Sequence, residues 1–198
     1  MRDKGMKEKK MILASASPRR KELLALMGLS FQVVPSREKE VPEGDTPAEI
    51  VENLSRQKAE AVAAGYQDGM ILGADTIVVC DGEIMGKPRT KEDAFHMLHS
   101  LQGRTHEVYT GVTLIDVEHG ERTYDTFSRK ALVTVHVMED WEIWAYIEKG
   151  ESMDKAGAYG IQGRCAAFIR EINGDYNNVV GLPVGRVYQE LKGMGRKR

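Results

Sequence analysis

The chain has 198 residues, of which 41% are apolar and 29% charged, and this length indicates one domain or at most two small ones. Its 28 Lys and Arg against 30 Asp and Glu give a formal net charge of −2, which excludes the strongly basic class of nucleic-acid-binding proteins. No apolar run approaches the ~20 residues that span a bilayer, and the start lacks a signal-peptide pattern, so we expect a cytoplasmic protein without membrane segments. The two cysteines are too few for a disulfide framework or a zinc cage.

Helix and strand patterns alternate after residues 1–10, which we expect to form a disordered basic arm. The expected strands are residues 11–14, 31–34, 70–80, 107–117, 123–137 and 165–172. The expected helices are residues 18–28, 46–64, 90–103 and 139–149, and one after Pro183. Three helices have a hydroxyl residue at the expected N-cap: Ser17, Thr46 and Thr90. With a hairpin around residues 118–120, these elements indicate an α/β fold, a mixed sheet flanked by helices, in a single domain over residues 11–192.

The segment SASPRR, residues 15–20, places two arginines in the first turn of a helix, where the helix dipole already favours negative charge. Free backbone N–H groups, two hydroxyls and two guanidinium groups together form a phosphate-binding site. The alternative is that Arg19 and Arg20 both point into water, as most surface arginines do. The residues alone do not decide between the two interpretations.

A carboxylate, Asp75, interrupts the most apolar run of the chain, residues 70–80. Burial of a carboxylate without a facing cation or donor is costly, and such groups commonly serve as general bases or metal ligands. We therefore interpret Asp75 as a functional residue. The alternative is a bulge or strand end that exposes it to solvent.

Two lysines are further candidate site residues. Lys58 is on the apolar face of the helix expected at residues 46–64, and it either extends to the rim of that face or directs its ammonium to a ligand. The apolar residues of that face are Val51, Leu54 and Val62. Lys87 follows the turn at residues 81–82, and taken alone it is interpreted as a solvated loop lysine.

Glycine recurs at every third position towards the end of residues 154–163, which include Gln162. Glycine lets a backbone approach a ligand closely, and an amide that both donates and accepts matches a nucleobase edge. The alternative is a flexible surface loop. Trp141 and Trp144, on the preceding helix, are interpreted as core residues.

Five motifs occur in order along nearly the whole chain: SASPRR, GADT, GKP, DKAGAYGIQG and GDYNNVVGLP. Together they resemble the Maf family of nucleotide pyrophosphatases. The resemblance implies a fold like that of the inosine triphosphate pyrophosphatases with the active site in a central cleft, a cytoplasmic location and frequent homodimers. It also implies hydrolysis of nucleoside triphosphates to the monophosphate and pyrophosphate with a divalent metal cation, Mg²⁺, Mn²⁺ or Co²⁺.

The resemblance places the family's proton acceptor at Asp75 and an acidic residue linked to metal binding at Glu40, whereas Lys39 stands where relatives often have a second acid. The positions that separate the subgroups hold, in this sequence, Arg19, Thr76 and Gln162. This combination resembles enzymes that prefer dTTP and UTP. Relatives that act on 7-methyl-GTP carry other residue types at these positions.

We therefore hypothesise that four cationic side chains bind the negatively charged triphosphate: Arg19, Arg20, Lys58 and Lys87. Ser15 adds a hydroxyl to the substrate site. Asp75 orients and deprotonates the water that attacks the α-phosphorus, and a divalent cation held by Glu40, with Asp75 as a candidate second ligand, bridges phosphate oxygens. The rival functions are a nucleotide-binding regulator of septum formation or cell division with little turnover, and hydrolysis of modified pyrimidine triphosphates. No nucleic-acid partner is expected, because basic residues cluster only at the tails.

Overall fold

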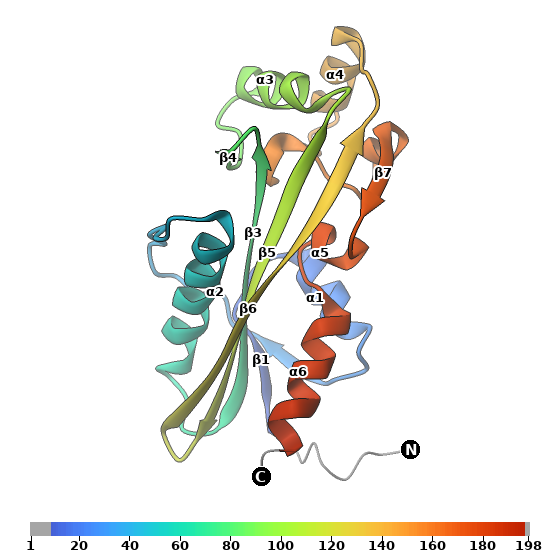
Figure 1. Cartoon of the computed structure of the whole chain (residues 1–198). Coiled ribbons are helices and arrows are strands. Elements are labelled where there is room, and N and C mark those ends of the chain that lie inside the picture. Colours follow the sequence, from blue (N-terminus) through green and yellow to red (C-terminus); the bar gives the residue numbers. More distant parts are fainter. Residues whose placement is uncertain (1–8, 197–198) are drawn as a thin grey trace. The chain divides into compact units, whose positions relative to one another are not determined.

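The computed structural model describes residues 9–196, so residues 1–8 of the expected basic arm lie outside the described residues (Figure 1). The chain forms two compact units. The first unit comprises the described residues within 1–75, 110–129 and 181–198, and the second comprises residues 76–109 and 130–180. Within residues 9–196, no helix is both long and apolar enough to cross a membrane.

Parallel strands form one side of the sheet in the first unit. β1 (Met11–Leu13) pairs in parallel with β2 (Phe31–Val33) on one side and with β3 (Gly69–Cys80) on the other. The side chains of β1 and most of those of β3 are buried, which is why both strands are continuous apolar runs in the sequence rather than alternating ones.

A long hairpin completes this sheet. β5 (Thr105–Glu118) and β6 (Glu121–Val135) follow β3 in the strand order and supply residues to both units. Their two-residue turn consists of His119 and Gly120, both with positive φ (52° and 85°), as a tight hairpin turn requires. The sheet therefore combines parallel and antiparallel strands, and the mixed α/β fold expected from the sequence is confirmed.

Three helices cover the sheet of the first unit. α2 (Pro47–Ala63) lies on one side of the strands, whereas α1 (Pro18–Ala25) and α6 (Val184–Arg196) lie on the other (Figure 1). Ser17 caps α1 and Thr46 caps α2, as predicted. The core under α2 is built from small and branched apolar side chains: Ile12, Ala14, Ala59, Val62, Ala63, Ile71, Ile115 and Val117.

The second unit contains the other ends of the long strands. β4 (Glu83–Met85) pairs antiparallel with β3, and β7 (Ile169–Asn173) pairs antiparallel with β6. Its helices and 3₁₀ turns are α3 (Lys91–Leu101), α4 (Asp140–Ile147), α5 (Tyr176–Val180), η1 (Ala156–Ala158) and η2 (Arg164–Phe168). Thr90 caps α3 by accepting a hydrogen bond from the N–H of Asp93, as predicted.

The strand expected at residues 165–172 begins later than predicted. Gly163, with φ of 87°, turns the chain into the 3₁₀ helix η2, which buries Cys165. Strand pairing with β6 therefore starts only at Ile169.

The interpretation of both tryptophans as core residues is wrong for one of them. Trp141 is 69% exposed, because the short helix α4 buries a different face through Ile143 and Ile147. Trp144 is half-buried and stacks on Phe95 of α3, with 4.9 Å between the ring centroids.

Candidate active site

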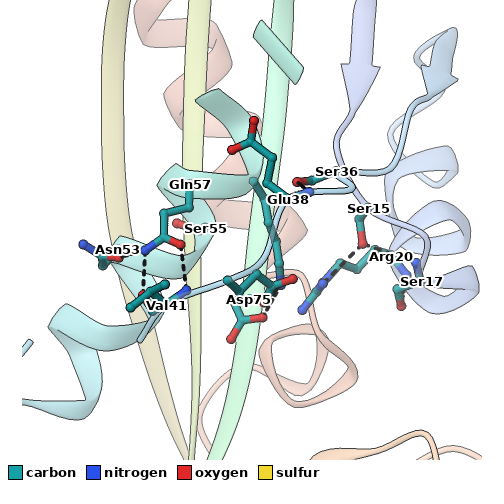
Figure 2. A network of polar contacts seen from close by, with 12 residues as sticks. Ser15, Ser17, Arg20, Ser36, Glu38, Val41, Asn53, Ser55, Gln57 and Asp75 are labelled. Carbon is teal, nitrogen blue, oxygen red and sulfur yellow. Dashed lines mark hydrogen bonds and ion pairs between the residues drawn. The ribbon is translucent and has the colours of Figure 1, made fainter. Parts of the chain in front are cut away.

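The N-terminal turn of α1 holds one of its two arginines against the protein. The Arg20 guanidinium donates from Nε to the backbone oxygen of Gly181 (2.9 Å) and from Nη1 to Oγ of Ser15 (3.3 Å). Ser15 is buried, and its hydroxyl also accepts a hydrogen bond from the N–H of Ser17 (3.3 Å). Arg20 therefore does not simply point into water, and Figure 2 shows its guanidinium directed toward Asp75.

The charge environment of Arg20 links this turn to the predicted carboxylates. Burial lowers the pKa of the Arg20 guanidinium, and the nearby Asp75 carboxylate raises it. Arg19, half-buried on the same turn, lowers this pKa further, and Glu40 raises it. Since arginine stays protonated in proteins, Arg20 brings a permanent positive charge to the two acids. The first unit thus joins the SASPRR turn to Asp75, as the sequence predicts.

Two glycines let α2 lie directly on the sheet beside Asp75. A Cβ on Gly73 of β3 would lie 2.3 Å from the backbone oxygen of Ser55, and a Cβ on Gly111 of β5 would lie 2.1 Å from that of Val51. Side chains two residues apart point to the same face of a strand. Asp75 therefore shares the face of Gly73 and points to α2.

Lys58 of α2 meets Asp75 on that face. Its Nζ forms an ion pair with Oδ1 of Asp75 and a second one with Oε2 of Glu40 at 3.0 Å. The side chains of Lys58 and Asp75 are 12% and 15% exposed. Two alternatives left open by the sequence, a lysine extending to the rim and an aspartate exposed at a bulge, are therefore wrong.

Glu40 is held in place by a helix residue that the sequence did not single out. Oε1 of Gln57 accepts a hydrogen bond from the N–H of Val41 (3.0 Å), and Nε2 of Gln57 donates to the oxygen of Val41 (2.6 Å) (Figure 2). Gln57 also donates to Asn53 on the preceding turn of α2. A glutamine on a helix surface is ordinary in a sequence, so no pattern pointed to this contact.

A pocket of about 260 Å³ opens beside these residues, between α2 and the segment that follows β2. Its lining residues are Ser36, Glu38, Lys39, Glu40, Gln57, Lys58, Glu60, Ala61 and Ala64. Lys39 lines the same pocket as Glu40 and Lys58. Charges of both signs therefore face the pocket.

The carboxylates of Glu40 and Asp75 fit a hard divalent cation. Both contact the same ammonium group, that of Lys58, so their oxygens converge on one point that already holds a positive charge. Carboxylate oxygens suit Mg²⁺ and Mn²⁺, and Mg²⁺ commonly takes only one or two of them besides water and substrate phosphate. Among the described residues, no group of three or more His, Cys, Asp and Glu could hold a metal by itself.

The remaining predicted residues belong to the second unit. Thr76 follows Asp75 in β3 and points to the opposite face of the strand. Lys87 and Gln162 are both exposed. The glycine-rich segment is tied to the segment of Lys87, because the N–H of Gly157 donates to the oxygen of Gly86 (3.1 Å).

Buried aromatic side chains anchor the glycine-rich segment further. The hydroxyl of Tyr146 accepts a hydrogen bond from the N–H of Gly160 (3.1 Å), and the hydroxyl of Tyr159 hydrogen-bonds Nε2 of His106 (2.7 Å). Burial lowers the pKa of His106 to about 4, so this ring is neutral at pH 7. The segment before Gln162 is therefore fixed at several backbone points, unlike a flexible surface loop.

A family model and curated relatives match nearly the whole chain. The profile of the Maf-like protein family matches residues 10–194. The dTTP/UTP pyrophosphatase of Agathobacter rectalis is 49% identical over 93% of this chain and 97% of its own length, and that of Carboxydothermus hydrogenoformans is 48% identical over 94% and 99%. Among solved structures, the Staphylococcus aureus Ham1 protein aligns with a TM-score of 0.46 and 14% identity, covering 64% of this chain and 72% of that one. The chain belongs to the Maf-like protein family.

Proposed function

We propose that this protein hydrolyses dTTP and UTP to the nucleoside monophosphate and pyrophosphate. The observation that carries the proposal is the cluster in which Asp75 meets the ammonium of Lys58 and lies close to the guanidinium of Arg20. The relatives that match almost the full chain at 48–49% identity are dTTP/UTP pyrophosphatases, which supports the same substrates for this chain.

The phosphate tail binds at the start of α1. Backbone N–H groups at a helix N-terminus and a fixed guanidinium favour a polyanion, and Arg20 is held in place by Ser15 and Gly181. We assign further phosphate contacts to Arg19, Lys58 and Lys87, so that about four cations balance the charge that phosphoryl transfer develops. The hydroxyl of Ser15 supports this site through its contact with Arg20.

Asp75 is the general base. Its carboxylate accepts a proton from a water molecule whose oxygen forms a bond to the α-phosphorus, while the bond from the α-phosphorus to the bridging oxygen breaks and pyrophosphate leaves. In the free protein, Lys58 holds the carboxylate in one orientation through its ion pair. Burial of both side chains limits competing contacts with bulk water.

Glu40, with Asp75, would hold a divalent cation, Mg²⁺, Mn²⁺ or Co²⁺. Such a cation supplies charge neutralisation at the phosphate oxygens when bound. Gln57 keeps the backbone next to Glu40 on α2 and thereby directs this carboxylate to the site.

Selectivity for the base is assigned to Gln162, with Thr76 and Arg19 as the other discriminating positions. An amide donates and accepts at once, as the N3–H and the neighbouring carbonyl of uracil or thymine require. The anchored segment before Gln162 supports such a role, because a recognition group on a fixed backbone loses less entropy on binding. A cytoplasmic location and a homodimer rest on the resemblance alone and stay predictions.

Pyrophosphate release tests this function. Purified full-length protein is mixed with UTP, dTTP, CTP, ATP and GTP in the presence of Mg²⁺, Mn²⁺ or Co²⁺, and pyrophosphate and monophosphate are quantified together. We expect equal amounts of both products, with UTP and dTTP preferred. Binding of UTP without release of pyrophosphate would instead support the regulator that binds nucleotides with little turnover.

A further inference from the structure

Lys58 occupies the position in which a metal ion would contact the two carboxylates of the site. Its Nζ lies 3.0 Å from Oε2 of Glu40 and forms a second ion pair with Oδ1 of Asp75. The lysine side chain is only 12% exposed, so its ammonium is taken out of water and relies on these two partners.

An ammonium and a divalent cation compete for the same carboxylate oxygens. A metal bound by the two carboxylate oxygens that now face Nζ would lie close to the present Nζ position, where two positive charges repel. Among the described residues, no third His, Cys, Asp or Glu joins these two in a group that could hold a metal. Metal binding to the free protein therefore requires displacement of the Lys58 ammonium.

The cluster contains one fixed cation and one that can move. Arg20 is held by the oxygen of Gly181 and the hydroxyl of Ser15, whereas Lys58 has only the two carboxylates as hydrogen-bond and ion-pair partners within residues 9–196. A lysine has a flexible four-carbon stem and carries a compact charge, so its ammonium can turn from a carboxylate to a nearby phosphate. A bound triphosphate would supply that phosphate.

We propose that Lys58 is a resident counter-ion that keeps divalent metal out of the Glu40–Asp75 pair until a nucleotide arrives and accepts its ammonium. This inference rests on the proposed function, because the nucleotide phosphates are what release Lys58. Metal and nucleotide binding are then positively coupled, and the coupling is reciprocal: each ligand increases the affinity for the other by the same factor. Lys58 would thus contact the phosphates when a nucleotide is bound and block the metal site when none is bound.

Mn²⁺ binding without turnover tests the proposal. The free Mn²⁺ signal in electron paramagnetic resonance gives the Kd of the full-length protein, alone and with the non-hydrolysable α,β-methylene-UTP. For the wild type we expect weak Mn²⁺ binding alone and at least tenfold tighter binding with the analogue. For Lys58→Met we expect at least tenfold tighter binding in the absence of the analogue and a coupling factor several-fold smaller than in the wild type, because only the contact between the metal and the phosphates then couples the two ligands.

Three variants serve as controls. Lys39→Met removes a positive charge from the same pocket without touching either carboxylate, so its effect should be less than threefold. Lys58→Gln keeps a polar side chain and should behave as Lys58→Met does, so the test does not depend on one variant folding, which circular dichroism checks. Adding Asp75→Asn to Lys58→Met should abolish the gain in Mn²⁺ affinity.

The outcomes separate the inference from the proposed function. An Mn²⁺ Kd of either Lys58 variant that is unchanged, weaker, or altered no more than in Lys39→Met overturns the counter-ion role, even if the wild type releases pyrophosphate from UTP. Tighter Mn²⁺ binding by the Lys58 variants supports the counter-ion role, even if the wild type releases none, in which case only the proposed hydrolysis fails.

Discussion

Replacement of Gly73 by alanine tests how strongly the catalytic geometry depends on the close packing of α2 against the sheet. The added Cβ would lie 2.3 Å from the backbone oxygen of Ser55 and 2.8 Å from the backbone nitrogen of Ala59, and real Cβ contacts are not shorter than 3.0 Å. Both neighbours are backbone atoms of the helix, so the helix as a whole has to move by at least about 0.7 Å, the difference between these distances. Overpacking of this kind typically destabilises by about 1–3 kcal/mol.

The same displacement moves Lys58, because it lies on the same helix turn as Ala59. A shift of about 1 Å in a catalytic group typically costs about 100-fold in rate. We expect kcat/KM for UTP to fall about 10- to 100-fold, and the thermal midpoint to fall by about 2–4 °C for each kcal/mol lost. Gly193→Ala on α6 is the matched control, since its Cβ would meet nothing within 4 Å and alanine favours the helix by up to about 1 kcal/mol. A Gly73→Ala protein with wild-type midpoint and kcat/KM refutes this reasoning.

Three further predictions address other parts of the structure. Gln57→Leu removes both hydrogen bonds that hold the backbone beside Glu40, so the Mg²⁺ concentration for half-maximal activity should rise about tenfold. The control Gln189→Leu on α6 should leave this concentration unchanged. Equal Mg²⁺ requirements of the two variants would argue against the positioning role of Gln57. Gln162→Glu removes the amide donor, so the ratio of kcat/KM for UTP and dTTP to that for other nucleotides should fall, and an unchanged ratio excludes base recognition by this residue. The pKa of His106 is about 4 when folded and about 6.5 when unfolded, so the unfolded chain binds the proton first and stability should fall by about 2 kcal/mol between pH 7 and pH 5. In thermal melts of His106→Gln, this contribution to the loss of stability at low pH should be absent. The same pH dependence of stability in the variant and the wild type would exclude His106 as its source.

The sequence predicted those parts of the site that depend on local patterns. Ser17 and Thr46 cap helices through contacts within four residues, so their spacing alone identifies them. Lys58 and Asp75 stood out because each places a charge in an apolar pattern, and the structure pairs them. Each residue of this ion pair is predicted separately from the sequence, because a charged residue in an apolar pattern commonly has a functional role.

The sequence did not predict contacts between distant segments. Two such contacts depend on how α2 packs against its neighbours: the hydrogen bonds between Gln57 and Val41, and the close approach of α2 to Gly73. Neither contact produces a periodic pattern in the sequence. The expectation of a core position for Trp141 is wrong because tertiary packing decides which face of the short helix α4 is buried, and hydrophobicity alone does not indicate that face.

The central claim, that Asp75 takes the proton of the attacking water, is tested most directly by the turnover number of Asp75→Asn with UTP. The substitution keeps the shape of the side chain and removes the base, so we predict a fall in kcat of about 10²- to 10⁴-fold. Asp81→Asn is the matched control, because Asp81 is an exposed residue at positive φ, a conformation that asparagine also tolerates, and its kcat should stay within twofold of the wild type. An undiminished kcat for Asp75→Asn would contradict the account.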